Sequence, residues 1–267
     1  TRPDNVNSLY SGSDDITKVN LSYAINNDTM MYVTFAEGYR PGGANRTTQL
    51  GATYDADFLE SKEIGFKSML MDGRLRLNGA LYLMDWDDIQ LGWFDSSISL
   101  LGLVDNIGKA ESDGTEIDLK YLVNDAVSIA VGFSENSTAL KEDYTLRGAV
   151  EARDGQDLPF TPDKKYNVTI NVDVTDTSSF QFNHVFVDEM WNDLFYDDRE
   201  IQDSYAISNM SFTTQIGDKS TMQIYMDNIF DEVAELFINN DEKLKQNLEN
   251  TYFKNNKETP NININDS

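Results

Sequence analysis

Few residues of this sequence have the types and spacing that catalysis or metal binding requires. His184 is the only histidine, and because no further ligand stands at a suitable spacing from it, we interpret it as a residue of a strand. Asp87 and Asp88 are adjacent carboxylates, but nothing in the sequence places an acid against a nucleophile, as a glycosidase needs. The sequence therefore predicts no catalytic residue, no metal site and no cofactor, and we do not expect an enzyme.

An acidic segment near the end of the chain, "VDEMWNDLFYDDRE", offers oxygen ligands of the kind that a hard cation prefers. Its spacing matches no calcium-binding loop, so a solvated acidic loop is the simpler interpretation. The carboxylates of this segment are Asp188, Glu189, Asp193, Asp197, Asp198 and Glu200.

The stretch "GYRPGG", Gly38 to Gly43, is the remaining candidate for chemistry, because glycine-rich turns after strands can hold phosphate. No Lys-Ser/Thr pair follows it, and the next residues do not have a helical pattern. Pro41 removes a ladder donor, and Gly42 and Gly43 permit unusual backbone conformations. We therefore interpret the stretch as the end of a strand and the start of a loop.

Composition excludes several classes of protein. The formal charge of -25 argues against a nucleic-acid partner, which would require clustered lysine and arginine. Cysteine is absent, which excludes disulfides and thiolate chemistry. The sequence contains no apolar run of the length that a membrane-spanning helix needs.

Apolar and polar residues alternate with a period of two along most of the chain, which is typical of half-buried strands. Opposite the apolar residues stand polar and charged ones such as Glu116, Asp118 and Lys120. The pattern predicts about ten strands, each with one apolar face. The apolar sets are Met31, Val33 and Phe35; Leu75, Leu77, Leu81 and Leu83; Ile117, Leu119 and Tyr121; Val127, Ile129, Val131 and Phe133; and Val168, Ile170, Val172 and Val174.

Short and long connections alternate between these strands. Turn residues mark five tight hairpins, at 26–28, 72–73, 124–125, 176–178 and 217–218. The other four connections, 40–56, 91–104, 141–164 and 189–202, are too long for tight turns. We expect all the short turns at one end of an antiparallel sheet and all the long loops at the other, as in outer-membrane barrels.

A soluble β-sandwich would show the same alternation, because its apolar faces pack against a second sheet. Strand candidates such as 57–71 and 74–90 are longer than the strands of most soluble proteins, which favours a membrane barrel. The predicted fold class is all-β: an antiparallel up-and-down meander that forms part of a transmembrane β-barrel. We expect an open, curved sheet, with unpaired edges near 15–26 and 221–231.

Five segments, in this order and spacing, resemble the C-terminal barrel half of TonB-dependent outer-membrane receptors. They are "YVTFAEGYRPGGANR", "SKEIGFKSMLMDGRLRLNGALYLMDWDDIQL", "VDNIGKAESDGTEIDLKY", "LPFTPDKKYNVTINVDV" and "MQIYMDNIFDE". They include the family's Gly-Tyr-Arg-Pro-Gly turn at Gly38–Gly42, its Glu-x-Gly-x-Lys strand at Glu63–Lys67 and its Asn-x-Phe-Asp element at Asn228–Asp231. Together these motifs identify the chain as similar to that family over Tyr32–Glu232.

The resemblance implies a receptor in the outer membrane of a Gram-negative bacterium. Such a receptor would bind a scarce nutrient, such as a ferric siderophore, cobalamin or a glycan, and TonB would drive uptake by pulling on a plug domain. Implied partners are the TonB complex, the barrel assembly machinery, and outer-membrane lipid and lipopolysaccharide. A passive channel or a structural or adhesive barrel is the alternative, which an upstream plug with a TonB-contacting segment would exclude.

The chain departs from the family pattern at both ends. We expect residues 1–235 to form a partial barrel that lacks the plug and the first half of the wall. Residues 236–267 are polar and rich in asparagine and lysine, without the closing strand of the family. We therefore expect them to form a divergent tail.

Large amphipathic residues in the predicted loops are candidates for ligand contacts. The alternative for the aromatic residues is an interfacial girdle or packing within a loop. The candidate ligand-binding residues are Arg40, Trp93, Phe94, Trp191, Phe195 and Tyr196.

Overall fold

The computed structural model describes residues 10–45, 52–93, 103–195 and 200–236. The chain divides into two compact units, Thr1–Glu235 and Leu236–Ser267, and the fold given below is that of the first. Of the second unit, only Leu236 is among the described residues.

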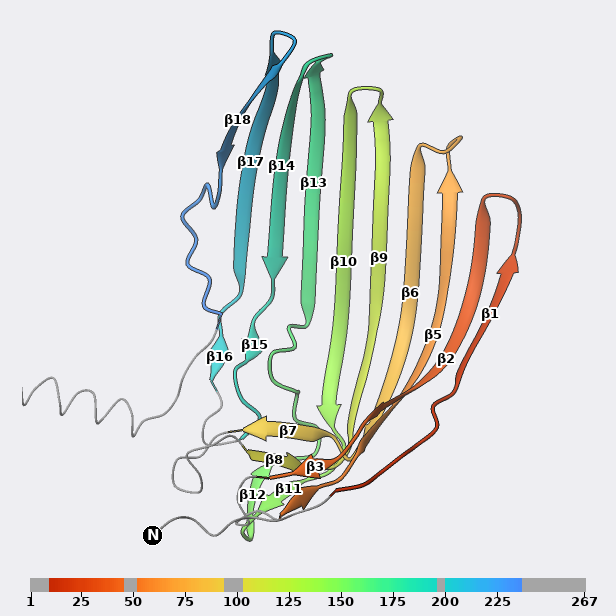
Figure 1. Ribbon diagram of the computed structural model, residues 1–267, viewed down its shortest axis with the longest axis vertical. Coiled ribbons are helices and arrows are strands. Elements are labelled where there is room, and N and C mark those ends of the chain that lie inside the picture. Colours follow the sequence, from red (N-terminus) through yellow and green to blue (C-terminus); the bar gives the residue numbers. More distant parts are fainter. Residues whose placement is uncertain (1–9, 46–51, 94–102, 196–199, 237–267) are drawn as a thin grey trace, which may run out of the picture. The chain divides into compact units, whose positions relative to one another are not determined.

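One ten-stranded sheet dominates the structure, and its strands follow one another in chain order (Figure 1). Every neighbouring pair is antiparallel, so the sheet is an up-and-down meander, as predicted. Its strands are β1 (Lys18–Ala24), β2 (Thr29–Arg40), β5 (Asp57–Leu70), β6 (Leu75–Asp87), β9 (Ala110–Asn124), β10 (Val127–Leu140), β13 (Lys164–Thr175), β14 (Ser178–Val187), β17 (Tyr205–Ile216) and β18 (Ser220–Met226). No helix of the described ranges is long and apolar enough to cross a membrane.

The short turns all lie at one end of the sheet and the long loops at the other, as the alternation of connection lengths predicted (Figure 1). The turn after β5 places Met71 and Asp72 at φ 55° and 54° and Gly73 at φ 86°, a left-handed backbone that glycine adopts without strain. In the turn after β1, the N–H of Asp28 donates to Asn26 Oδ1 over 2.8 Å. Local side-chain chemistry thus closes the hairpins.

Each long loop contains a small hairpin that the sequence pattern did not predict. These two-stranded sheets are β3 (Gly43–Ala44) with β4 (Thr53–Tyr54), β7 (Gln90–Trp93) with β8 (Leu103–Asn106), β11 (Tyr144–Leu146) with β12 (Ala149–Ala152), and β15 (Met190–Trp191) with β16 (Ile201–Gln202). Strands of two to four residues are too short to show alternation, so they escape a periodicity argument.

Register aligns the alternating apolar residues of neighbouring long strands on one face of the sheet. Leu77 lies opposite Leu119, which lies opposite Val131, which in turn lies opposite Val168. On the other face, Asn78, Asp118, Gly132 and Asn167 form the adjacent row. The predicted division therefore holds, with Glu116, Asp118 and Lys120 on the polar face.

In the part of the chain that the structure describes, no second large sheet covers the apolar face. Many of its side chains are exposed, among them Leu21 at 72%, Leu81 at 56% and Ile64 at 46%. A soluble sandwich would bury these residues in a core. The buried hydrophobic residues of the described chain lie instead around the long loops, as set out below. The apolar face is thus suited to lipid.

We call the apolar face of the sheet the outward face. Towards the loop end, its residues change from apolar to charged at a similar place on neighbouring strands. The last apolar residue and the first charged one are Phe35 and Glu37, Ile64 and Lys62, Leu83 and Asp85, Phe133 and Glu135, and Tyr166 and Lys164. From Tyr166 to Val174, β13 extends for about 27 Å at about 3.4 Å per residue. This compares well with the apolar band of about 25 Å that outer-membrane barrels present to lipid. We call these outward residues, from the turns to this boundary, the apolar band.

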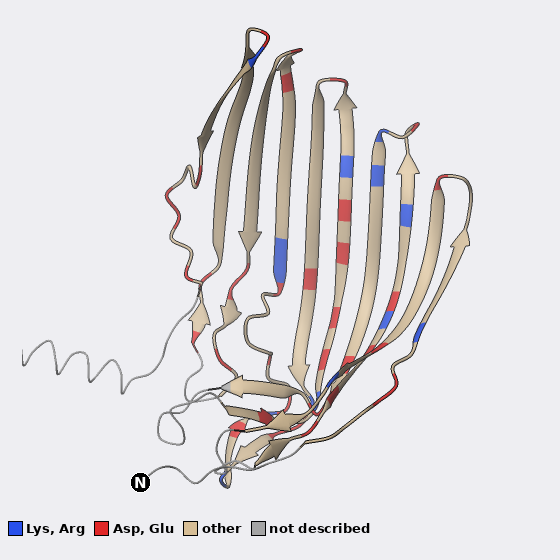
Figure 2. Cartoon of the chain, in the orientation of Figure 1, with Lys and Arg blue, Asp and Glu red and all other residues tan. Residues whose placement is uncertain are grey.

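Ion pairs link neighbouring strands beyond this boundary. Lys62 Nζ lies 3.2 Å from Asp85 Oδ2, Lys141 Nζ 3.1 Å from Glu111 Oε1, and Lys164 Nζ 3.7 Å from Glu135 Oε1. Figure 2 shows the charged residues along the strands. Charges on the outward face thus begin close to the edge of the apolar band, where Lys62 lies directly opposite Phe35 and Leu83.

The Glu63–Lys67 segment of β5 owes its glycine to a tyrosine of the neighbouring strand. Tyr32 lies opposite Gly65 on the polar face, and a Cβ at Gly65 would come within 2.5 Å of the Tyr32 ring. The ammonium group of Lys67 lies 5.6 Å from the centroid of the same ring, within the range of a cation–π contact. Glycine therefore lets the ring lie flat against the wall.

Among the described residues, no strand pairs with either edge of the sheet, as expected. All seven residues of β1 and all seven of β18 are exposed. β1 runs from the loop end towards the turn end, whereas β18 runs from the turn end towards the loop end (Figure 1). The described sheet is therefore an open wall.

If the apolar band faces lipid, a charge will be costly on that face and tolerated on the other. We expect Ile170→Arg to lower the free energy of unfolding by about 2 to 4 kcal/mol. Its direct neighbour in sequence, Thr169, points to the polar face and supplies the matched control, Thr169→Arg. Urea titration in phospholipid vesicles measures both, and an equal or larger loss for Thr169→Arg would contradict the assignment of the faces.

Candidate functional site

The four long loops, 41–56, 88–109, 141–163 and 188–204, pack together at one end of the sheet. We call their described residues the loop cap. Its core contains residues from the last three loops and the adjoining strand ends, and Leu140 and Ala152 are fully buried. The buried cluster comprises Ile89, Ile107, Ala110, Leu140, Tyr144, Ala152, Leu194 and Phe195. Burial of these side chains holds the cap together.

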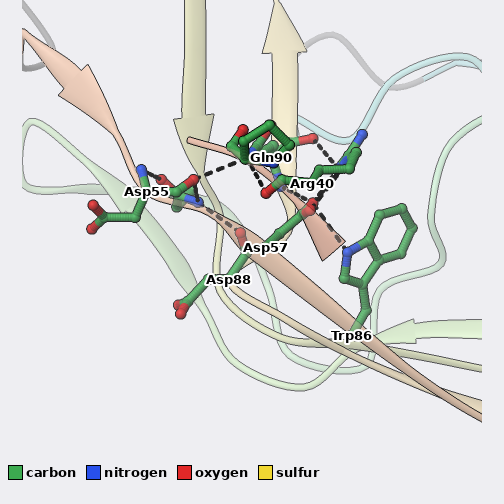
Figure 3. Close-up of polar contacts among 8 residues, drawn as sticks. Arg40, Asp55, Asp57, Trp86, Asp88 and Gln90 are labelled. Carbon is green, nitrogen blue, oxygen red and sulfur yellow. Dashed lines mark hydrogen bonds and ion pairs between the residues drawn. The ribbon is translucent and has the colours of Figure 1, made fainter. Parts of the chain in front are cut away.

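One carboxylate joins the first loop to the second (Figure 3). Asp57, at the start of β5, accepts hydrogen bonds from Arg40 Nε at 2.9 Å, Trp86 Nε1 at 3.1 Å and the N–H of Gln90 at 3.1 Å. Arg40 also donates through Nη2 and forms an ion pair with the same oxygen. The Asp57 side chain is 2% exposed and that of Arg40 49%. A buried carboxylate with this many donors fixes the ends of β2, β5 and β6 relative to one another.

Amide side chains extend this connection. Gln90 Nε2 donates to the carbonyls of Pro41 and Asp55 over 3.1 and 2.9 Å. Asn106 Nδ2 donates to the carbonyl of Asp88 over 2.7 Å, and its Oδ1 accepts from the N–H of Asp55 over 2.7 Å. These bonds satisfy loop backbone groups that have no ladder partner.

The third loop contacts the second and the fourth. Tyr144 Oη donates to Asp105 Oδ2 over 2.7 Å, and its ring stacks on Phe195 at a centroid distance of 5.9 Å. Gln156 Nε2 donates to the carbonyl of Leu194 over 2.7 Å. Burial raises the pKa of Tyr144, and the hydrogen bond to Asp105 raises it further, so the phenol remains a neutral donor.

Electrostatics at Asp57 favour the charged carboxylate. Burial raises the pKa of Asp57. The hydrogen bond from Arg40, that from Gln90, the charge of Arg40 and the hydrogen bond from Trp86 together lower it by more. The net pKa of Asp57 therefore lies below its ordinary value, and the ion pair persists at neutral pH.

The candidate residues from the sequence fall into different environments. Arg40 is held by Asp57, and Phe195 lies in the core of the cap, where 9% of it is exposed. Trp191 lies in β15 and is half-buried. Trp93 ends β7 opposite Leu103, while Phe94 and Tyr196 lie outside the described residues. A ligand-binding role for this set remains a prediction.

The structure also places the residues considered for other chemistry. His184 Nδ1 lies 2.8 Å from Ser208 Oγ, and its ring lies 5.9 Å from that of Tyr166. In the acidic segment, Asp193 Oδ1 accepts from the N–H of Phe195 over 3.0 Å, which is a local turn contact. Within the described ranges, no group of three or more histidines and carboxylates is placed to hold a metal ion. The glycine-rich stretch leads into β3, where a Cβ at Gly42 would come within 2.5 Å of the carbonyl of Tyr54.

The polar face of the wall contains a hollow of about 460 Å³. Its lining combines acidic, basic and amide side chains, including Tyr32, Glu116, Asp118, Lys165 and Asn167. These residues come from β2, β9 and β13, so the hollow lies along the inward side of the strands. Loop cap and polar inner face are the two surfaces of the wall that are suited to polar partners.

Comparison with known proteins decides the family. A family model described as TonB dependent receptor-like, beta-barrel matches residues 2–229. The chain belongs to this family of TonB-dependent receptors. Its five motifs, its meander and its division into turn end and loop end are thus features of a receptor barrel.

Relatives of this receptor barrel include the pesticin receptor of Yersinia pestis, which is 24% identical over 220 residues. That match covers 80% of this chain and 31% of the pesticin receptor. Among solved structures, the ferric yersiniabactin uptake receptor FyuA from Yersinia pestis has a TM-score of 0.69 at 21% identity, over 84% of this chain and 34% of that one. The ferric-catecholate import receptor Fiu from Escherichia coli K12 has a TM-score of 0.65 at 19% identity, over 84% and 32%. This chain therefore spans about a third of the length of these relatives.

Residues missed by sequence reasoning hold the cap of this receptor barrel together. Asp57, Gln90 and Asn106 were not candidates, because single polar residues in loops carry no periodic signal. The signal that could have found Asp57 is its pairing with Arg40. The two residues lie directly opposite each other at the ends of β5 and β2. Two opposite charges at facing strand ends indicate a cross-strand ion pair.

Loss of the Asp57 charge will loosen the first two loops. We expect Asp57→Asn to destabilise the contact by about 2 kcal/mol, because the charged acceptor of several hydrogen bonds is removed. Hydrogen exchange at residues 41–45 and 88–93 measures the effect. Asp85→Asn is the matched control, because its partner Lys62 is half-exposed at 49% and the pair contributes little. Equal protection in Asp57→Asn and wild type would contradict the role of Asp57.

Acid will have the same effect on the cap. A carboxyl whose folded pKa is depressed stabilises the fold above its unfolded pKa of about 3.9, and this stability is lost as the pH falls through the folded pKa. Exchange protection at residues 88–93 should therefore be constant from neutral pH to about pH 4 and decrease below it. Asp57→Asn should remove this step, and a step that persists in the variant would assign it to another group.

Proposed function

We propose that this chain is part of the barrel wall of an outer-membrane receptor that takes up a ferric chelate with energy delivered through TonB. Membership of the TonB-dependent receptor family supports this function. FyuA is a ferric yersiniabactin uptake receptor and Fiu a ferric-catecholate import receptor, and both share the fold. One observation carries the proposal: the wall has a face suited to lipid, and the long loops at one end of the same wall pack together into a folded cap.

The parts of the chain have distinct roles in this proposal. The apolar band, from β1 to β18, anchors the wall in the lipid of a Gram-negative outer membrane. The loop cap faces the medium and meets the ligand. Its candidate contacts are Arg40, Trp93, Trp191 and Phe195, and the other candidates, Phe94 and Tyr196, lie outside the described residues. Asp57 and Arg40 hold the first two loops in place, so that they present a preformed surface to the ligand.

The polar inner face is the side on which a plug domain would lie. The plug would carry the contact with TonB, and the assembly machinery would insert the barrel into the membrane. Residues 1–235 form the barrel part in this proposal, and residues 236–267 form a tail beyond the family match, which ends at residue 229. The barrel positions and admits its cargo without chemical change, so the function is transport.

Uptake of iron tests the proposal. We expect the intact receptor that carries this chain to give ⁵⁵Fe uptake from a ferric siderophore in Gram-negative cells that lack their own receptors. Uptake should require TonB, because the chelate is moved against its gradient. Uptake that is equal in a strain without TonB would instead indicate a passive channel.

Two substitutions distinguish ligand binding from insertion of the barrel into the membrane. Asp57→Asn should reduce chelate binding while the barrel still reaches the membrane in normal amounts, because it alters the cap and leaves the apolar band unchanged. Ile170→Arg should do the reverse and reduce the amount of inserted barrel. Loss of insertion in both variants would remove the distinction between anchoring wall and binding cap.

A further inference from the structure

A short strap in the third loop, Leu158–Asp163 ("LPFTPD"), has its backbone fixed at several points. The N–H of Leu158 donates to Thr138 Oγ1 over 3.0 Å, and Asn136 Nδ2 donates to the carbonyl of Pro162 over 3.1 Å. The N–H of Asn136 donates to the carbonyl of Asp163 over 2.8 Å. These contacts hold both ends of the strap on β10, and Pro162 is buried.

Phe160 stands in the middle of this strap in an unfavourable backbone conformation. Its φ is 56°, in the left-handed region, which costs free energy for any residue with a Cβ and is rare for bulky ones. Its N–H donates to the carbonyl of Trp191 over 2.8 Å, and this bond joins the strap to the fourth loop. Glycine would make the same bond without strain.

The Phe160 side chain offsets little of this cost by burial, because 48% of the residue is exposed. An aromatic ring on a rigid, strained backbone loses little conformational entropy when a partner covers it. Strain of this kind persists where the surrounding structure over-determines it, and it gathers at binding sites. The strap thus displays a large apolar surface in a fixed position.

Lipid does not account for this exposure. Lys164 and Glu135, which form an ion pair across β13 and β10, lie between the strap and the apolar band. Phe160 therefore belongs to the loop cap, on the side of the medium. A soluble partner is the occupant that this position favours.

The charge of the long loops indicates which kind of partner would bind there. In sequence, the four long loops contain seventeen acidic residues and six basic ones. Close to the strap, burial raises the pKa of Asp163, and the charges of Asp157 and Asp188 raise it further while that of Lys164 lowers it. An anionic ligand would be repelled, whereas a cationic group beside an aromatic face gains a cation–π contact.

We propose that Phe160 is a ligand-contact residue of the loop cap and selects a positively charged ferric chelate. This assignment rests on the proposed function and names its substrate class. Phe160 supplies the apolar and π surface, while the acidic loops supply the attraction over longer range. Specificity then comes from repulsion of anionic chelates as well as from contact with the cationic one.

The test measures equilibrium binding of two iron chelates to the intact receptor in outer-membrane vesicles. Ferrioxamine B carries a free ammonium group, whereas ferric enterobactin is anionic. We expect tighter binding of ferrioxamine B, and we expect Phe160→Ala to weaken it about tenfold, which is the size of a moderate cation–π contact. Phe160→Trp should retain binding, because it keeps the π surface.

Two further variants separate contact from folding. Phe160→Gly should weaken binding as Phe160→Ala does, while its melting temperature is no lower than that of wild type, since glycine relieves the left-handed strain. Phe230→Ala is the matched control, because Phe230 is 71% exposed but lies after β18, outside the loop cap. It should bind ferrioxamine B as the wild type does.

Each other result overturns the inference. Unchanged binding in Phe160→Ala would show that the ring does not touch the ligand, and equal or tighter binding of ferric enterobactin would show that charge does not select. If the wild type binds neither chelate, the assigned substrate class is wrong, while TonB-dependent uptake from another chelate still supports the proposed function. If Phe160→Ala weakened the association of the receptor with vesicles and left chelate binding unchanged, the ring would contact lipid and not the ligand.

Discussion

Register is the constraint on which the rest of this structure depends. Side chains alternate along a strand, so a slip of one residue between two strands would move every apolar residue of one of them to the polar face. The ladders place Leu77, Leu119, Val131 and Val168 in one row, and so give the wall a continuous apolar face. The tight turns set this register, and the lipid-suited face selects it, because a charge in the apolar band is costly. Because the strands of this meander alternate in direction and every second connection is long, the long connections gather at one end.

The long loops at this end of the sheet need other interactions than the strands to hold their backbone in place. Loops that share one end of a sheet bring backbone groups together that no ladder satisfies. Side chains take over: Asp57 collects donors from Arg40, Trp86 and Gln90, and Asn106 bridges the first two loops. A small hydrophobic cluster around Leu140 and Tyr144 then supplies the burial that the lipid-suited wall does not. Stability of the wall and stability of the cap thus come from different interactions, which lets the loops vary without altering the strands.

The sequence predicts the wall well and the cap poorly, for a physical reason. Alternation in stretches such as Val127–Phe133 and Val168–Val174 repeats often enough to define a face, and turn residues such as Gly73 mark where each strand ends. Contacts in the cap join residues far apart in sequence, such as Arg40 with the carbonyl of Gln90 or Tyr144 with Asp105, and these leave no periodic trace. Phe195 illustrates the difference: its type suggested a ligand contact, and nothing in the sequence indicated that it packs in the buried cluster of the cap. Phe160 illustrates the converse, since its left-handed backbone and its exposure, which set it apart, leave no pattern in the sequence.

The two edge strands run in opposite directions, and this restricts the number of strands that could be added to complete the wall. β18 runs towards the loop end and β1 runs away from it, so a first added strand beside β18 has to run from the loop end to the turn end to pair antiparallel. The last added strand, beside β1, has to run the other way if it is also to pair antiparallel. Only an even number of strands meets both conditions. Strands that complete this wall by antiparallel pairing at both edges would therefore come as whole hairpins.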